Sequence, residues 1–420
     1  MRKLAIAVPT YNRKKDIDFF IDQISFVLGY DDVDLLVYDS SEGNETEQVV
    51  ERYREGKYPN LSYFRYPSEM ASNEKFFRIY KDLSNKYGYI WLIHDHTVFS
   101  SEAFSFIYEK LAIQPDFVYL KIHTPPSVTG CEICEENDMN EFILKNAWFL
   151  GKIGAAIINT GSFFEGIDWE YYCRKYLCKK RINFSHVGLF FERLACLKDP
   201  KVYTFIFPRE CFNDTYKYKT LAWDRDRIRI ATQGWGEVIA ALPDSYKNKE
   251  EVFKTADRYI ITKYILIDFK EKGMYSQIVF LKYRNWIKKI FPEVYEDAKR
   301  IAFMSASKAR KMYINPMIRH ISDARSDGRS IFIYGAGIHA YECMKLLQQY
   351  DIIPEGFVVS SMLGNPSEIG SFPVISLEEL LRDKKKLCFV LAVMDIYKDD
   401  IINGINKANL DGSDIEYCSY

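Results

Sequence analysis

The sequence predicts an α/β protein built on a doubly wound, mostly parallel sheet, and three observations lead to this fold class. Short continuous apolar runs, which are typical of buried parallel strands, occur at 4–8, 33–38, 61–65 and 89–93. A helical apolar pattern follows the first three of these runs, as at 16–28. The alternation of strand and helix repeats within the first 93 residues, which indicates strand–helix–strand units that share one sheet.

The pattern changes twice along the rest of the chain. Between 117 and 218 we expect strands and helices in mixed order, and from 223 to about 324 the chain reads as helical. A turn-rich segment then precedes a new strand at 331–334, which indicates a second, small Rossmann-like unit. The individual elements expected are strands at 117–122, 155–158, 202–207, 357–359 and 387–393, helices at 184–197 and 341–349, and a polar loop at 124–140.

Composition excludes several classes of protein. The formal net charge of −1 gives no general attraction to nucleic acid, so we expect no nucleic-acid partner. The sequence has no apolar run long enough for a transmembrane helix, and Met1-Arg2-Lys3 leads directly into a strand instead of a signal peptide. Nine cysteines without a secretory signal are expected to be reduced thiols. We therefore expect a cytoplasmic protein.

Polar residues stand at the ends of three predicted strands. Asn12, Asp39 and Asp95 follow the first, second and fourth strand, so they should lie on the same rim of the sheet, where open α/β sheets bind ligands. Asp95 is flanked by His94 and His96. A carboxylate beside imidazoles is a suitable ligand set for a divalent cation such as Mn²⁺.

These residues carry a resemblance to a known family. Ala7–Arg13, Val37–Ser40 and the strand that reaches Asp95 resemble the donor half of a family 2 glycosyltransferase with the GT-A fold. The resemblance covers about residues 1–120, and no motif extends it further. With the composition of the later segments, it implies three regions: a GT-A domain at 1–222 (donor half 1–120, acceptor half 121–222), a helical, basic linker region at 223–328, and a Rossmann-like domain at 329–420.

The resemblance also implies roles for individual residues. It places Pro9, Thr10 and Tyr11 around the nucleobase and ribose, and Arg13 near the pyrophosphate. Asp39 would accept a hydrogen bond from the nucleobase, typically uracil, and Asn73 would contact the donor. Asp95 would belong to the motif that binds the donor diphosphate through a metal ion.

The metal motif is where this chain departs from the family. The family usually has two or three aspartates, whereas this chain has His94-Asp95-His96-Thr97, with Thr97 where another acid is often found. We expect Asp95 and His96 to hold Mn²⁺ or Mg²⁺, and His94 to support or cap the site. The substituted motif also leaves open a weakly metal-dependent or inactive site.

A catalytic base must deprotonate the acceptor hydroxyl, and the family usually takes it from the acceptor half. His186, Glu192 and Asp168 are the candidates, with Glu170 beside them. Each of these residues could equally have a structural or surface role.

The segment Gly335-Ala336-Gly337-Ile338-His339-Ala340 follows a strand and matches a dinucleotide fingerprint. The next strand ends in Ser360-Ser361, without the acid that would bind a ribose hydroxyl, which argues against NAD. The unit resembles a small Rossmann-like module of sugar-nucleotide pathways that is appended to some bacterial glycosyltransferases. A structural or oligomerising appendage is the favoured interpretation.

The leading hypothesis is a glycosyltransferase that moves a sugar from a nucleotide-sugar donor, typically UDP-linked, to a hydroxyl of a glycan, lipid-linked oligosaccharide or glycoprotein, with inversion. The alternatives are a catalytically inactive partner subunit and a nicotinamide-dependent sugar oxidoreductase. The segment 282–329 holds twelve Lys or Arg against five Asp or Glu, with Trp286 among them. This segment fits either peripheral contact with the inner face of a membrane or a solvated helical linker. A homo-oligomer is also compatible with the sequence.

Overall fold

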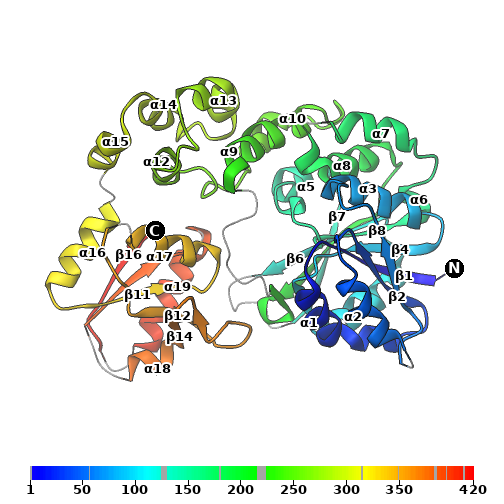
Figure 1. Cartoon of the computed structure of the whole chain (residues 1–420), viewed down its shortest axis with the longest axis horizontal. Coiled ribbons are helices and arrows are strands. Elements are labelled where there is room, and N and C mark those ends of the chain that lie inside the picture. Colours follow the sequence, from blue (N-terminus) through cyan, green and yellow to red (C-terminus); the bar gives the residue numbers. More distant parts are fainter. Residues whose placement is uncertain are drawn as a thin grey trace. The chain divides into compact units, whose positions relative to one another are not determined.

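The structure is a computed structural model, and its description covers residues 2–55, 57–123, 130–178, 181–214, 224–313, 316–348, 350–382, 386–393, 395–409 and 412–420. By their contacts, the described residues up to Phe303 form one compact unit, and those from Met304 onward form a second (Figure 1). The predicted domain boundaries at 222 and 328 stay predictions.

The first unit is built on an eight-stranded sheet of order β3-β2-β1-β4-β8-β6-β9-β7. Its first half is parallel and consists of β1 (Arg2–Thr10), β2 (Val33–Asp39), β3 (Leu61–Arg65) and β4 (Tyr87–Leu92). Every residue of β2 is buried, as expected for a central strand covered on both faces. The predicted class, an α/β fold with a doubly wound, mostly parallel sheet, is confirmed.

The second half of this sheet is mixed. β8 (Ala156–Asn159) is antiparallel to β4 and to β6 (Phe117–His123), and β9 (Val202–Pro208) is parallel to β6. The edge strand β7 (Glu132–Glu136) contradicts the loop predicted over 124–140, and residues 124–129 of that loop lie outside the described part of the chain. Four of the five β7 residues are exposed, so the strand has no apolar face that a sequence pattern could reveal.

Helices α1 (Lys14–Ile24), α2 (Glu45–Arg54), α3 (Ser72–Leu83) and α4 (Ser101–Lys110) connect or follow the parallel strands. α1 buries Ile17, Phe20, Ile21 and Ile24, which is the face that the sequence predicts. Ser72 is the first residue of α3, whose N-cap Ala71 makes no side-chain bond, and Tyr87 begins β4.

The remaining helices of this unit come mainly after β6, and a small antiparallel sheet joins two distant segments. That sheet pairs β5 (Thr97–Phe99) with β10 (Phe212–Asp214). The described chain between residues 224 and 324 is predominantly helical, as predicted. The helices are α5 (Met139–Asn146), α6 (Thr160–Phe163), α7 (Trp169–Tyr176), α8 (Ser185–Cys196), α9 (Arg227–Arg229), α10 (Trp235–Ala240), α11 (Lys249–Phe253), α12 (Lys263–Glu271), α13 (Gln277–Ile290) and α14 (Tyr295–Phe303).

The basic segment around α13 packs its tryptophan inward. The Trp286 ring lies against Gly236 of α10, and its centroid is 5.8 Å from that of Phe253. Trp286 is therefore a packing residue, not the membrane anchor that the sequence left open. Within the residues that the structure describes, no helix combines the length and the apolar character needed to cross a membrane.

We expect Gly236→Ala to destabilise the first unit by about 1–3 kcal/mol, because a Cβ there would lie 2.2 Å from the Trp286 ring. Thermal unfolding measures the effect. Gly404→Ala in a helix of the second unit is the matched control, since a Cβ at that position meets open space; it should be neutral or stabilising by up to about 1 kcal/mol. Equal melting curves for Gly236→Ala and the wild type would contradict the packing.

The second unit contains a six-stranded sheet of order β13-β14-β12-β11-β15-β16, parallel except for β13. Gly335 ends the first strand with φ +115°, and a Cβ there would lie 3.2 Å from the Ala392 carbonyl, so glycine is required at this turn. The arrangement is Rossmann-like, while its kinship to sugar-nucleotide modules stays a prediction. The elements are α15 (Ala306–Met312), α16 (Pro316–Ser326), β11 (Ser330–Tyr334), α17 (Ile338–Gln348), β12 (Gly356–Val359), β13 (Glu368–Ile369), β14 (Phe372–Ser376), α18 (Leu377–Leu381), β15 (Leu387–Leu391), α19 (Asp395–Ala408) and β16 (Ile415–Ser419).

Candidate functional site

The carboxyl ends of β2, β1 and β4 lie next to one another, which places three predicted site residues on one rim. Thr10 and Asp39 are register partners at the ends of β1 and β2. Asp95 follows β4, the other neighbour of β1. The exposed fractions are 3% for Thr10, 0% for Asp39 and 2% for Asp95, so the two carboxylates are buried although they lie at the edge of the sheet.

Asp95 is held by three neighbours. Its Oδ2 accepts a hydrogen bond of 2.7 Å from the Thr10 hydroxyl, and its Oδ1 accepts one of 3.0 Å from Arg13 Nη1. His96 Nδ1 lies 3.2 Å from the same Oδ1 and 3.4 Å from Arg13 Nη1. The ring of His94 stacks on that of His96 with 4.7 Å between centroids, which matches its expected supporting role.

These contacts keep Asp95 ionised. Burial acts to raise the pKa of its carboxyl, but the hydrogen bond from His96, the Arg13 charge and the Thr10 hydroxyl together hold that pKa below its usual value. Asp95 is therefore a carboxylate at neutral pH, and Arg13 compensates its charge.

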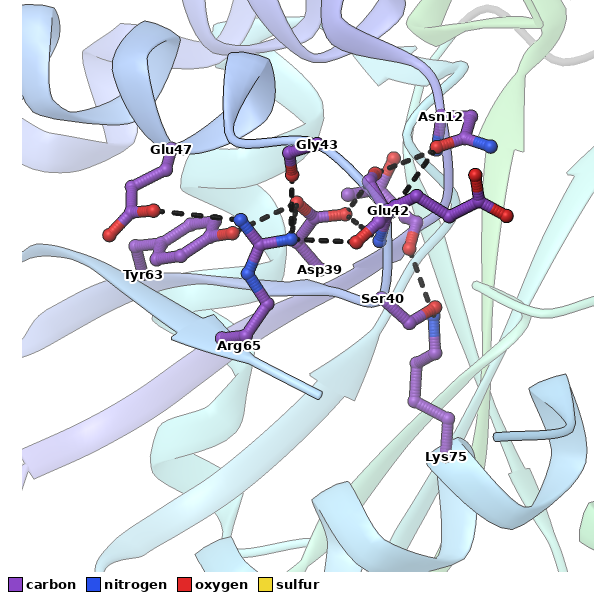
Figure 2. Close-up of polar contacts among 11 residues, drawn as sticks. Asn12, Asp39, Ser40, Glu42, Gly43, Glu47, Tyr63, Arg65 and Lys75 are labelled. Atoms are coloured by element: carbon purple, nitrogen blue, oxygen red, sulfur yellow. Dashed lines mark hydrogen bonds and ion pairs between the residues drawn. The ribbon is translucent and has the colours of Figure 1, made fainter. Parts of the chain in front are cut away.

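Asp39 is held by a separate set of donors. Its Oδ1 accepts the backbone N–H of Ser41 at 2.8 Å and the Ser41 hydroxyl, and its Oδ2 accepts the Tyr63 hydroxyl at 2.9 Å (Figure 2). Arg65 Nη1 lies 3.8 Å from Oδ2. These are three of the roughly four hydrogen bonds that a carboxylate can accept. Asp39 therefore retains capacity for one further N–H donor.

Arg65 and Asn12 fix the loops around Asp39. Arg65 Nη1 donates to the carbonyls of Ser41 and Gly43, each at 2.7 Å (Figure 2). The backbone N–H of Asn12 donates to the Ser41 hydroxyl at 2.8 Å, and Asn12 adopts φ +54°, a left-handed conformation that asparagine tolerates better than most residues. The loops after β1 and β2 are therefore tied to each other before any ligand arrives.

Lys75 links the Asp39 side of the rim to the Asp95 side, and the sequence analysis missed it. Its Nζ donates to the Thr10 carbonyl at 2.9 Å and to the Ser40 hydroxyl at 2.5 Å (Figure 2). It is 4% exposed, and burial lowers its pKa to about 8, while Asp39 and Asp95 act in the opposite direction. The sequence held one signal for this residue: Lys75 lies one turn before Ile79, on the face of α3 that is buried. A lysine on a buried helix face is rare unless it is paired.

The other residues assigned to the donor lie on or near the same rim. Pro9 is buried within β1, and Tyr11 follows the strand with 46% of its surface exposed. Asn73 is half-buried in the first turn of α3, two residues before Lys75. Contact of these three residues with a donor stays a prediction.

The three candidate bases each have a structural contact of their own. Asp168 is the N-cap of α7 and accepts the Tyr171 N–H at 3.0 Å. Glu192 is buried in α8, where it accepts the hydroxyls of Tyr171 and Tyr176 and pairs with Lys175 Nζ at 2.6 Å. A catalytic role for either residue stays a prediction.

His186 lies in the first turn of α8, which begins at Ser185, within the helix predicted at 184–197. Its Nε2 is 3.1 Å from the Gly151 carbonyl, and burial lowers the pKa of its ring to about 4. The imidazole is therefore neutral at pH 7, and its role as a base stays a prediction.

A divalent metal ion fits this site poorly. Both oxygens of Asp95 are already engaged, and Arg13 Nη1 lies within 3.4 Å of both proposed ligand atoms, Asp95 Oδ1 and His96 Nδ1. Thr97 is buried, and its hydroxyl lacks a hydrogen-bond partner among the described residues, but a neutral hydroxyl supplies no charge for a cation. Within the described chain, no group of three or more His, Cys, Asp or Glu is placed to hold a metal. In the structure, Asp95 and His96 lie against the Arg13 guanidinium instead of around a metal ion.

Comparison with known proteins gives similarity only at the level of solved structures, since no family model and no curated protein matches the sequence. Staphylococcus aureus TarS 1–349 in complex with UDP is 11% identical, with 74% of this chain and 91% of that chain covered and a TM-score of 0.39. Mycobacterium tuberculosis glucosyl-3-phosphoglycerate synthase, in complex with Mn²⁺, UDP and glucosyl-3-phosphoglycerate, is 13% identical, with 58% and 82% covered and a TM-score of 0.36.

A third similar structure is named for a different reaction. The 4-diphosphocytidyl-2C-methyl-D-erythritol synthase from Anaerococcus prevotii is 11% identical, with 49% of this chain and 89% of that chain covered and a TM-score of 0.32. Identities and TM-scores this low carry no information about the reaction. The chemistry of this chain has to come from its own residues.

Proposed function

We propose that this protein is a glycosyltransferase that binds a nucleotide-sugar donor at the rim formed by β2, β1 and β4. One observation carries the proposal: two buried carboxylates, Asp39 and Asp95, lie at the carboxyl ends of β2 and β4, the two parallel strands that flank β1, and Lys75 links the loops that hold them. In open α/β sheets, ligands bind at this edge. Buried ionisable groups with shifted pKa values cluster at binding and catalytic sites.

The donor is proposed to be UDP-linked. Asp39 can accept one more hydrogen bond, and the N3–H of uracil is a donor of the right kind for a carboxylate. The exposed ring of Tyr11, one residue beyond β1, is available to stack on the base. Arg65, which fixes the loop after β2, holds the Asp39 side of this pocket in place.

The acceptor is proposed to be a hydroxyl of a glycan, a lipid-linked oligosaccharide or a glycoprotein, with inversion at the sugar carbon. Among the three candidate bases, Asp168 is exposed, whereas His186 and Glu192 are buried. Membrane contact, as part of the same proposal, would use α13, where Ile278 is 78% exposed and Lys282 is also exposed.

The proposal is tested by titrating the purified protein with UDP, GDP, ADP and CDP, and by measuring nucleotide release from the corresponding sugar nucleotides. We expect UDP to bind best and Asp39→Asn to weaken it by about tenfold or more, because the amide cannot replace a charged acceptor. Asp18→Asn is the matched control, since Asp18 is a half-buried residue of α1 that pairs with Arg52 and accepts the Tyr53 hydroxyl.

The outcomes separate the hypotheses. UDP binding with release of a sugar from one donor supports the enzyme. UDP binding without release, even when candidate acceptors are supplied, would favour the inactive partner subunit. Absence of binding by any nucleotide would remove the proposed function.

A further inference from the structure

We infer that the Arg13 guanidinium, positioned by Asp95, takes the place of the divalent ion, so that nucleotide diphosphate binding at this rim does not require a metal. The inference rests on the proposed function, because it concerns how the same site holds the diphosphate of its donor. Asp95 then acts as a positioning residue for Arg13, and His96 lies against the same guanidinium nitrogen.

The geometry of the cluster is the first support. Arg13 Nη1 lies 3.0 Å from Asp95 Oδ1 and 3.4 Å from His96 Nδ1, and these two atoms are 3.2 Å apart. The guanidinium nitrogen therefore faces the two atoms that a metal would need as ligands. A metal ion at about 2.1 Å from both of them, on the side that Arg13 occupies, would collide with this nitrogen.

The second support is the way the three side chains are held. The other oxygen of Asp95 is engaged by the Thr10 hydroxyl at 2.7 Å, so the carboxylate cannot turn away from Arg13. Asp95 is 2% exposed, whereas 35% of the Arg13 side chain is exposed. Arg13 is thus held by a buried carboxylate, while part of its own side chain is exposed and can contact a ligand.

The third support is chemical. A guanidinium presents five N–H donors in a planar fork that matches phosphate oxygens, and it stays charged at all working pH values. Lys75 provides a second cation on the other side of Thr10.

The experiment measures UDP binding by calorimetry in EDTA and in Mn²⁺. For the wild-type protein we expect affinities within about twofold of each other, since Arg13 itself supplies hydrogen bonds to the diphosphate. Arg13→Gln should weaken binding in EDTA by about tenfold or more, because a charge-assisted hydrogen bond to phosphate is lost. Mn²⁺ should restore part of that loss in the variant, since the position beside Asp95 and His96 is then open.

Two further variants complete the design. Arg54→Gln, on the exposed face of α2, removes the same charge away from the rim and should bind UDP like the wild type. Arg13→Lys keeps the charge without the fork and should lie between the wild type and Arg13→Gln, with thermal unfolding used to confirm that both Arg13 variants are folded.

Two results would contradict the inference, and the second would also contradict the proposed function. If the wild type binds UDP only with Mn²⁺, the inference is overturned and the proposed glycosyltransferase stands. If the wild type binds UDP in neither condition, the proposed function fails and the inference fails with it.

Discussion

Asp95→Ala should lower the free energy of unfolding by about 2–3 kcal/mol, because the variant leaves the Thr10 hydroxyl and the Arg13 guanidinium without the carboxylate that they contact. The carboxylate is 2% exposed, so water cannot readily replace it. UDP affinity should fall together with stability, since Arg13 is no longer held. Denaturant unfolding in EDTA and calorimetry measure the two effects.

Asp18→Ala provides the comparison for that variant. Asp18 also pairs with an arginine, Arg52, but the aspartate is 40% exposed and the arginine 59% exposed. An exposed ion pair contributes about 1 kcal/mol or less. Equal destabilisation by Asp95→Ala and Asp18→Ala would show that the Asp95 cluster is not the tightly held network described here.

Lys75→Met should weaken UDP binding at pH 7 by about tenfold or more, because it removes the buried cation that lies among Thr10, Ser40 and the two site carboxylates. Because the Lys75 pKa is about 8, the wild type should lose affinity as the pH rises through 8, while the variant stays flat. Calorimetry from pH 7 to 8.5, below the range in which the uracil N3–H itself ionises, tests this. A wild-type affinity that does not change with pH would contradict a functional charge on Lys75.

The same pKa shift predicts how stability depends on pH. The pKa of Lys75 falls from 10.5 to about 8 on folding, so between these values the unfolded chain binds the proton that the folded chain has released. Stability therefore rises with pH from about 8 to 10.5 and is independent of this group on either side of that window. Lys75→Met should remove this rise, and denaturant unfolding of both proteins across the window measures it.

The strand ends were predictable from the sequence because apolar runs and the polar residues after them are local signals. Asp39 ends β2 and Asp95 follows β4, close to where they were expected, since a continuous apolar run marks a strand covered on both faces. Arg13 was placed near the pyrophosphate only by resemblance. Its bond to Asp95 joins residues far apart in the chain, and no local pattern reports such a contact.

Other features could not be predicted, for identifiable physical reasons. β7 is an exposed edge strand with the composition of a loop, so only its pairing with β9 defines it. Lys75 is buried because its partners are a carbonyl and a hydroxyl on other elements, and the sequence does not show those partners. The burial of His186 and Glu192 is a result of how α8 packs, not of their own residue type.

The pairing of β5 with β10 has a consequence for how this site is made during synthesis. β5 begins two residues after Asp95, and its partner strand is residues 212–214. Non-local pairing of this kind forms late, because the intervening chain must first be closed into a loop. The turn that carries Asp95 and His96 therefore becomes anchored only after the ribosome has passed residue 214. A fragment ending at residue 120 would contain every residue of the donor rim, yet it would lack β10, the strand that pairs with β5 beside this turn.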